Sequence, residues 1–200
     1  MTRPFLLGLT GSIGMGKSTT SQMFRDEGIP VWDADSTVHQ LYSQGGAAVA
    51  PIRDICPEVI VANAVDRTKL KARIAQDPAT LRQIESIVHP LVAKDRAQFI
   101  DRAAKQKSDL IVLDIPLLFE TGADKIMDAT LVVTAPADVQ RARVLAREGM
   151  SEAQFDLILS RQMPDAEKRA RATFVIETVT LEAARIAVRK VIKAIRENHA

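Results

Sequence analysis

The chain has 200 residues, of which 46% are hydrophobic, 26% charged and 4% aromatic, a composition that suggests one domain with ample apolar mass for a core. Its formal net charge of +2 excludes a histone-like chain and a strongly acidic one. The single cysteine, Cys56, cannot form an intrachain disulfide, so it excludes a cysteine-based metal cluster and favours a reducing compartment.

The N-terminal segment predicts a strand, a helix and a second strand. Residues 5–9 form a short apolar run followed by glycines, which is typical of a buried parallel strand. Residues 17–27 have a helical pattern that Gly28 and Pro30 end, and Val31-Trp32 predicts a short second strand. No apolar run reaches the ~20 residues of a membrane span. A signal peptide is not expected, so we predict a cytoplasmic protein.

Residues 36–108 contain no convincing strand. Asp77-Pro78 is typical of a helix start, because aspartate caps helices and proline suits the first helical position. Apolar residues then recur at helical spacing: Leu81, Ile84, Ile87, Val88, Leu91 and Val92. We interpret this interval as a helical insertion that covers a substrate. The alternative is a helix simply packed on the sheet.

The second half of the chain alternates strands and helices. Residues 110–113 predict a buried strand between Asp109 and Asp114, and residues 129–134 predict another, after which Pro136 opens a helix. This alternation is the signature of a parallel α/β sheet.

The last fifty residues predict three helices and one strand. Ser151 to Gln154 fits a capping box, residues 161–171 are basic and helical in character, and residues 173–176 predict the last strand. The apolar stripe of a closing helix consists of Leu181, Ala184, Val188, Val191, Ile192 and Ile195.

The most specific motif is G-S-I-G-M-G-K-S, which matches G-x-x-x-x-G-K-[ST] between a predicted strand and a predicted helix. Glycines let backbone N–H groups turn inward around phosphate oxygens, and the following helix adds its dipole. Lys17 would reach the β- and γ-phosphates of ATP, and the Ser18 hydroxyl would bind Mg²⁺. A glycine-rich turn that binds nothing is the alternative. The predicted nucleotide-binding residues of this loop are Gly11, Ser12, Ile13, Gly14, Met15, Gly16, Lys17, Ser18 and Thr19.

Three classes of phosphate-loop protein carry such a motif: GTPases, motor or remodelling ATPases, and small-molecule kinases. A GTPase needs Asn-Lys-x-Asp, but neither of the two asparagines, Asn63 and Asn198, precedes a lysine, and Asp114 is not followed by x-x-Gly. A nucleic-acid motor needs a stacking surface, but Trp32 and Tyr42 are the only residues of their types, so no nucleic-acid partner is expected. A small-molecule kinase fits the length, because it must enclose its substrate to exclude water.

A kinase also needs a carboxylate that orients or deprotonates the acceptor hydroxyl. Asp33 and Asp35 follow the second predicted strand at the carboxyl edge of the sheet, where ligands bind. Two residues apart on an extended segment, they would share a face. One would accept a proton while the other helps to hold Mg²⁺ through water. The alternative is that Asp35 merely caps the next helix.

Four segments together resemble the dephospho-coenzyme A kinase family: the phosphate loop, residues 31–35 (VWDAD), His89-Pro90-Leu91 and residues 113–120 (LDIPLLFE). The resemblance runs from about residue 6 to residue 177. It implies that ATP phosphorylates the ribose 3′-hydroxyl of dephospho-CoA, giving CoA and ADP, as the last step of coenzyme A synthesis.

The resemblance implies roles for individual residues. Asp35 resembles the catalytic base, with Asp33, Lys17 and Arg143 completing the catalytic set. Ser18, Asp33 and, through water, Asp114 are the predicted Mg²⁺ residues.

The same resemblance places the substrate along two segments. The predicted substrate-binding residues are Asp35, His89, Pro90, Pro116, Leu117, Leu118, Phe119 and Glu120. Pro116 is expected to force an extended exit from the preceding strand, which would aim the next three residues either at an apolar part of the ligand or at the core. For His89, the alternative is a helix-end histidine before a proline break.

Arginines are predicted to close over the nucleotide. Arg143 and Arg147 are four residues apart and so share one helix face, and the resemblance implies a lid that supplies arginine to ATP phosphates and adenine. A solvated helix face is the alternative. Thr173 and Thr178 stand where the family often has Asp and Asn. A hydroxyl cannot replace an amide's paired donor and acceptor, so we expect backbone groups to contact adenine.

The predicted fold is therefore α/β, a three-layer phosphate-loop core with a parallel sheet, a helical substrate-binding insertion and a helical lid. The core comprises residues 1–35, 109–135 and 172–200, the insertion about residues 36–108 and the lid about residues 137–171. The expected cofactors are ATP and Mg²⁺, the substrate is dephospho-CoA, and the assembly is a monomer or small homo-oligomer.

Overall fold

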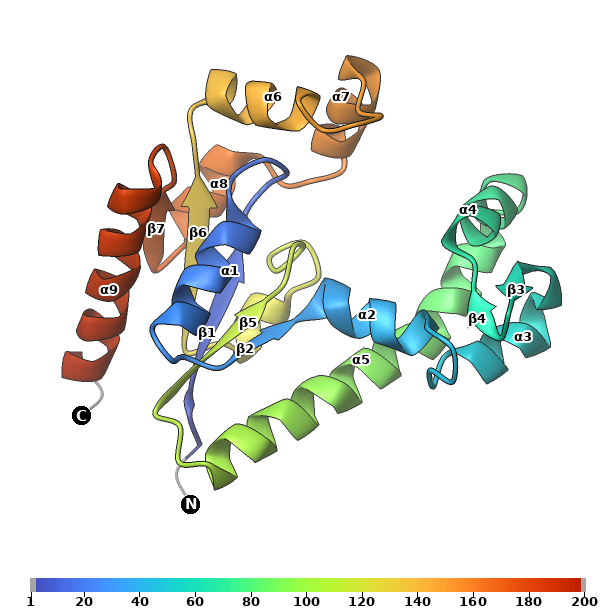
Figure 1. Cartoon of the computed structure of the whole chain (residues 1–200), viewed down its shortest axis with the longest axis horizontal. Coiled ribbons are helices and arrows are strands. Elements are labelled where there is room, and N and C mark those ends of the chain that lie inside the picture. Colours follow the sequence, from blue (N-terminus) through green and yellow to red (C-terminus); the bar gives the residue numbers. More distant parts are fainter. Residues whose placement is uncertain (1–2, 199–200) are drawn as a thin grey trace. The chain divides into compact units, whose positions relative to one another are not determined.

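The computed structural model describes residues 3–198, and its chain divides into two compact units (Figure 1). The first unit comprises residues up to Trp32 and from Ala103 onward, and the second comprises Asp33–Arg102. No helix within residues 3–198 combines the length and the apolar character that a bilayer crossing requires.

The first unit is built on a five-stranded sheet with the order β2-β5-β1-β6-β7. Its strands are β1 (Phe5–Thr10), β2 (Val31–Asp33), β5 (Leu110–Asp114), β6 (Ala129–Thr134) and β7 (Phe174–Glu177). Parallel neighbours flank β1, since Leu7 lies opposite Val112 on one side and Ala129 on the other. The predicted parallel α/β class is confirmed. The loop that leaves the central strand β1 emerges at the carboxyl edge, where such sheets bind ligands.

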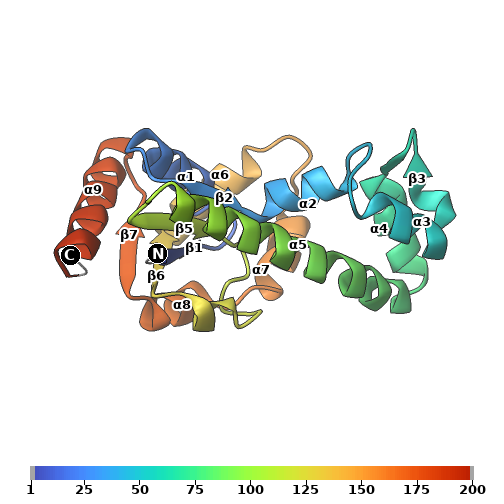
Figure 2. The ribbon, with the colours of Figure 1, turned by 90° about the horizontal axis from the view of Figure 1, so that it is seen from below.

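Helices cover both faces of this sheet. In Figure 2, α1 (Lys17–Asp26) and α9 (Leu181–Asn198) lie on one face and α8 (Asp165–Arg171) on the other. The core beneath α1 and α9 contains Phe24, Leu131 and Val188, all fully buried. The predicted apolar stripe of the closing helix is confirmed from Ala184 onward. It is wrong at Leu181, which is 68% exposed.

The remaining elements of the first unit are η2 (Ala123–Ile126), α6 (Ala137–Leu145) and α7 (Glu152–Ser160). The predicted capping box is confirmed, because the Ser151 hydroxyl accepts from the Gln154 N–H while the Gln154 side chain accepts from the Ser151 N–H. The predicted basic helix over residues 161–171 begins only at Asp165, since Pro164 adopts an extended conformation as the N-cap of α8.

The second unit is mainly helical and has its own core. Its helices are α2 (Ala34–Tyr42), α3 (Val49–Ile55), η1 (Pro57–Val59), α4 (Arg67–Gln76) and α5 (Ala79–Lys105), of which α5 ends in the first unit. The buried apolar residues of this unit pack together: Ala48, Val49, Ile52, Cys56, Val59, Val65, Leu70, Ile84 and Val88. Cys56 is therefore a packing residue.

One expectation and one alternative for this interval were wrong. Short antiparallel strands, β3 (Ile60–Val61) and β4 (Ala64–Val65), form a hairpin where no strand was expected. Ala62 and Asn63 in its turn both have positive φ, which a two-residue hairpin turn requires. Pro90 lies inside α5 without ending it, so His89 is not a helix-end residue. The 27-residue helix tolerates the loss of one backbone donor at that position.

Candidate active site

The phosphate loop between β1 and α1 is shaped by the need for glycine. Gly14 and Gly16 have φ values of 79° and 84°, in the left-handed region that glycine adopts without strain. A Cβ on Gly11 would lie 2.5 Å from Val133, and one on Gly16 would lie 2.9 Å from the Thr178 hydroxyl. Gly16 is also the N-cap of α1 and offers no side chain to its N–H groups. These amides can therefore serve an anion.

Lys17 and Asp114 form an ion pair at the carboxyl edge of β1 and β5. The Lys17 Nζ and Asp114 Oδ1 atoms are 2.6 Å apart, and the Asp114 carboxylate is fully buried. Its other oxygen accepts a hydrogen bond from the Ser21 hydroxyl. The pair balances the buried charge and holds the phosphate-loop lysine beside a carboxylate, at the place where the sequence predicted one.

Both predicted arginines line a hollow of about 270 Å³ on the α9 side of the phosphate loop. The hollow is lined by Gly14, Gly16, Thr19, Thr20, Met23, Arg143, Arg147, Thr178, Thr180, Leu181 and Ala184. Arg147 lies beyond the end of α6, so the expected shared helix face is wrong, although the two side chains line one hollow. Guanidinium groups bind phosphates and stack on planar rings, so the hollow suits a nucleotide.

Thr178 connects Arg143 to the phosphate loop. Its buried hydroxyl donates to the Met15 carbonyl at 2.9 Å and accepts from Arg143 Nη1 at 3.1 Å, while Arg143 Nη2 donates to the Thr178 carbonyl at 2.6 Å. Thr178 thus positions both the loop and the arginine. In the sequence, Thr178 stood out only as a departure from the family pattern. Nothing in the sequence predicted its hydrogen bonds to Met15 and Arg143.

The loop after β5 differs from its prediction. Pro116 begins a turn instead of an extended exit, and its carbonyl accepts from the Thr10 hydroxyl. Leu118 and Phe119 are buried, as the core alternative predicts, and their contact with the ligand stays a prediction. Leu117 remains exposed.

Glu120 was predicted to bind substrate, but its carboxylate is occupied within the protein. Oε1 lies 2.9 Å from the Nζ of the fully buried Lys168 and accepts from the Met163 N–H at 2.8 Å. Burial alone would raise the pKa of Glu120. The ion pair with Lys168 and the hydrogen bond from the Met163 N–H outweigh burial and hold that pKa below its ordinary value. Glu120 therefore anchors the segment that leads into α8.

The predicted catalytic carboxylates differ in their surroundings within the second unit. Asp33 is the N-cap of α2, with Oδ1 accepting from the Ser36 N–H at 2.7 Å. Asp35 is exposed in the first turn of α2. The alternative that Asp35 caps the helix is wrong, and so is the expectation of one shared extended segment. His89 and Pro90 are exposed on α5 in this same unit.

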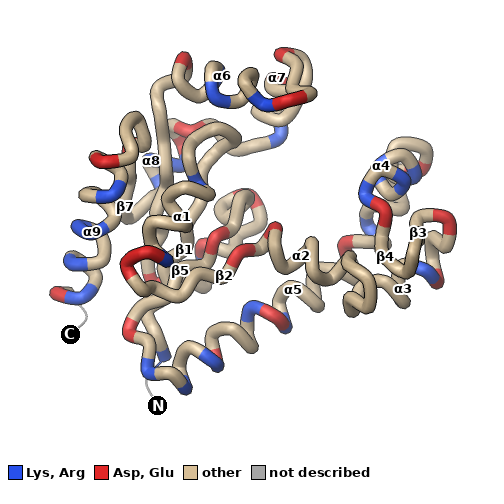
Figure 3. Tube along the Cα trace, in the orientation of Figure 1, with Lys and Arg blue, Asp and Glu red and all other residues tan. Residues whose placement is uncertain are grey.

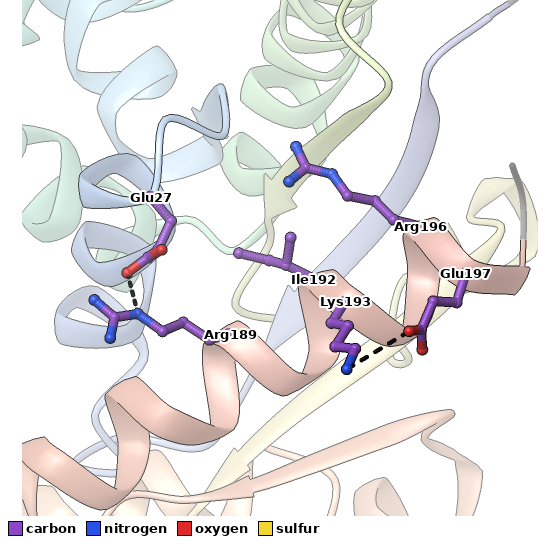
Figure 4. A pocket seen from close by; sticks show the side chains of 6 residues that line it. All are labelled: Glu27, Arg189, Ile192, Lys193, Arg196 and Glu197. Atoms are coloured by element: carbon purple, nitrogen blue, oxygen red, sulfur yellow. Dashed lines mark hydrogen bonds and ion pairs between the residues drawn. The ribbon is translucent and has the colours of Figure 1, made fainter.

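A second hollow, of about 470 Å³, lies along α9 near the end of α1 that is opposite the phosphate loop (Figure 4). Figure 3 shows Lys and Arg recurring along α9, and the cations that line this hollow have carboxylate partners. Arg189 pairs with Glu27 at 2.6 Å and Lys193 with Glu197 at 3.7 Å. Because these charges are balanced, we place the candidate active site at the phosphate loop instead.

Comparisons with known proteins identify the family of the chain. A family model for dephospho-CoA kinase matches residues 5–182. The dephospho-CoA kinase of Cereibacter sphaeroides is 58% identical over 98% of both chains, and that of Jannaschia sp. is 61% identical over 96% of this chain and 98% of the relative. The crystal structure of TT1252 from Thermus thermophilus, 33% identical, superposes with a TM-score of 0.84 over 96% of this chain and 98% of that chain. A Campylobacter jejuni dephospho-CoA kinase, 20% identical with a TM-score of 0.67 over 95% and 96% of the two chains, shares the fold.

Replacing Thr178 with valine should weaken nucleotide binding. The isosteric side chain removes the donor to the Met15 carbonyl and one acceptor of Arg143. We expect the Kd for Mg-ATP, measured by calorimetry, to rise about 5- to 10-fold, with a loss of about 1–2 kcal/mol in unfolding free energy. Thr178→Ser keeps the hydroxyl and should restore both values. Equal affinities of the valine and serine variants would show that the hydroxyl has no role.

Replacing Glu120 with glutamine should destabilise the first unit, because it leaves the buried Lys168 without its charge partner. We expect a loss of about 3 kcal/mol in urea unfolding at pH 7. Since the folded-state pKa of Glu120 is depressed, its contribution is complete above the ordinary glutamate pKa of about 4.3 and is lost as the pH falls through the folded-state value. The difference in unfolding free energy between Glu120→Gln and wild type should therefore become smaller below pH ~4.

The control is Glu27→Gln, which breaks the more exposed pair with Arg189. It should cost less than about 1 kcal/mol. A cost for Glu120→Gln no larger than that of the control would contradict the anchoring role.

Proposed function

The chain belongs to the dephospho-CoA kinase family, and on that premise we propose that it transfers the γ-phosphoryl group of ATP to the ribose 3′-hydroxyl of dephospho-CoA, giving CoA and ADP. The observation that carries the proposal is the complete phosphate loop with Lys17 held beside Asp114 at the carboxyl edge of the sheet. A loop of this kind binds a nucleoside triphosphate, and the family supplies the identity of the acceptor.

Binding of ATP would use the charges that surround the loop. The N–H groups at the start of α1 and the Lys17 ammonium would bind phosphate oxygens. Arg143 and Arg147 would meet the nucleotide in the hollow that they line, where their guanidinium groups neutralise charge that develops during transfer. The Thr178 hydroxyl already donates to the Met15 carbonyl and accepts from Arg143, so it is not available to adenine. Backbone groups near Thr178 would contact adenine instead.

The residues at the loop also fit Mg²⁺. Ser18 is exposed at the start of α1, and Asp114 supplies carboxylate oxygens, both of the hard type that Mg²⁺ prefers. No cluster of three or more His, Cys, Asp or Glu residues within residues 3–198 could hold a metal. That suits an ion held largely by phosphates and water. Ser18, Asp33 and Asp114, the last through water, are the proposed holders. When bound, the ion neutralises charge on the β- and γ-phosphates.

Asp35 is the proposed base. Its carboxylate is exposed, whereas that of Asp33 caps α2, so Asp35 is the better placed of the two to accept the proton of the substrate hydroxyl. His89 and Pro90, on the exposed face of α5, are proposed to lie on the substrate side. We place the enzyme in the cytoplasm as a monomer or small homo-oligomer.

Replacing Lys17 with alanine should abolish acceptor-dependent ADP formation. ADP formation by the purified protein is measured with Mg-ATP in the presence and absence of dephospho-CoA. Mass spectrometry then checks whether the product carries one added phosphate. We expect Lys17→Ala to reduce turnover at least about 100-fold, because the charge on the transferring phosphoryl group loses its nearest cation. Lys193→Ala, on the exposed surface of α9, is the control and should retain full activity. ATP binding by wild type without acceptor-dependent ADP would refute the substrate assignment.

Replacing Asp35 with asparagine should remove most of kcat, by about 10²- to 10⁴-fold, with little change in the Kd for ATP. Asp33→Asn is the matched variant, because asparagine caps helices as well as aspartate does. It should retain most of its activity at saturating Mg²⁺. If the Asp35→Asn variant turned over at the wild-type rate, Asp35 would not be the base.

A further inference from the structure

Two glutamines hold a single residue of the phosphate loop. The Ile13 N–H donates to Gln162 Oε1 at 3.1 Å, and Gln140 Nε2 donates to the Ile13 carbonyl at 2.7 Å. Gln140 lies on α6 and Gln162 just after α7, so both lie within the predicted lid over residues 137–171 and flank Arg143 and Arg147 in the sequence. The segment that contains α6 and α7 is therefore hydrogen-bonded to the phosphate loop at two points, Gln140 and Gln162, and both bonds are made to Ile13.

The chemistry of the Ile13 backbone fixes opposite roles for the two side chains. A backbone N–H requires an acceptor and a carbonyl requires a donor, so Gln162 must present its oxygen and Gln140 its nitrogen. Gln140 is buried, with 6% of its surface exposed. A side chain without a donor at this position would therefore leave the Ile13 carbonyl without a hydrogen bond.

Packing on both sides keeps the two glutamines in place. A Cβ on Gly14 would lie 2.5 Å from Val144 and 3.0 Å from the Gln140 carbonyl, so α6 approaches the loop as closely as glycine allows. On the other side, Met163 follows Gln162 directly, and its N–H is bound to Glu120. Neither glutamine can therefore follow a displaced loop without breaking other contacts.

We propose that Gln140 and Gln162 are positioning residues that use Ile13 to hold the lid arginines in register with the phosphate loop. Gln140 lies three residues before Arg143 on the same helix, so the bond to Ile13 sets how far that arginine stands from bound phosphates. The inference rests on the proposed function, because positioning matters only if Arg143 serves the nucleotide.

The test exploits the opposite roles of the two amides. Q162E keeps an oxygen that accepts from the Ile13 N–H, whereas Q140E replaces the donor with a carboxylate facing a carbonyl. Both variants add the same charge beside the same residue. We expect Q140E to lower kcat/KM for ATP at least about 10-fold further than Q162E does. Lowering the pH should reduce the Q140E defect, because a protonated carboxyl can donate to the carbonyl. Equal losses at all pH values would overturn the proposal.

A second test uses neutral variants and does not depend on transfer. Q140L removes the bond without adding charge, and its effect on the Kd for Mg-ATP is compared in wild-type and R143A backgrounds by calorimetry. If Gln140 acts through Arg143, the loss of affinity, about 3- to 10-fold in wild type, should largely vanish in the R143A background. Additive losses would overturn the proposal. Since binding is measured without acceptor, the test stands even if dephospho-CoA is not the substrate.

Folding is checked on the same samples. Urea unfolding of Q162E and Q162L shows whether either variant is folded at the assay temperature, and Q162L should bind Mg-ATP more weakly than Q162E because only the latter keeps an acceptor for Ile13. Wild-type affinity in both Q162L and Q140L would also overturn the proposal.

Discussion

Close packing around the phosphate loop is the constraint on which the rest of the first unit depends. Gly11 meets Val133 of β6, Gly14 meets Val144 of α6, and Gly16 meets Thr178 just after β7, each at a distance that leaves no room for a Cβ. The loop therefore packs against three segments from distant parts of the chain, and these contacts fix its conformation. A loop packed in this way is held in place before phosphates bind, and preorganised donors of this kind stabilise charge that develops in catalysis.

Charge at the carboxyl edge is arranged around the strand β5 and the loop that follows it. Asp114, the last residue of β5, neutralises the phosphate-loop lysine, and Glu120 further along the loop neutralises the buried Lys168 of α8. Removing buried charges from water is costly unless they are paired. The two pairs therefore tie β5 both to the nucleotide loop and to the segment that carries Gln162.

The sequence predicted the features that depend on local pattern. Buried apolar runs marked β1, β5 and β6, the Ser151 capping box was read from four residues, and the phosphate loop follows from its glycines and lysine. It did not predict features that depend on distant partners. The pair between Glu120 and Lys168 was not predicted, because spacing alone cannot pair residues 48 positions apart. The β3–β4 hairpin was not predicted, because strands of two residues are too short to show an alternating pattern in the sequence.

Thr178 shows why a departure from a family pattern does not by itself imply a lost function. An amide at this place would offer a donor and an acceptor outward to a base, whereas the shorter hydroxyl turns both toward the protein, to Met15 and Arg143. The residue therefore positions the phosphate loop and the arginine that is proposed to bind the nucleotide. The same logic applies to Gln140 and Gln162, which touch only the backbone of the loop. In this site, residues that fix the loop and the arginine shape recognition of phosphate as much as the groups that contact it.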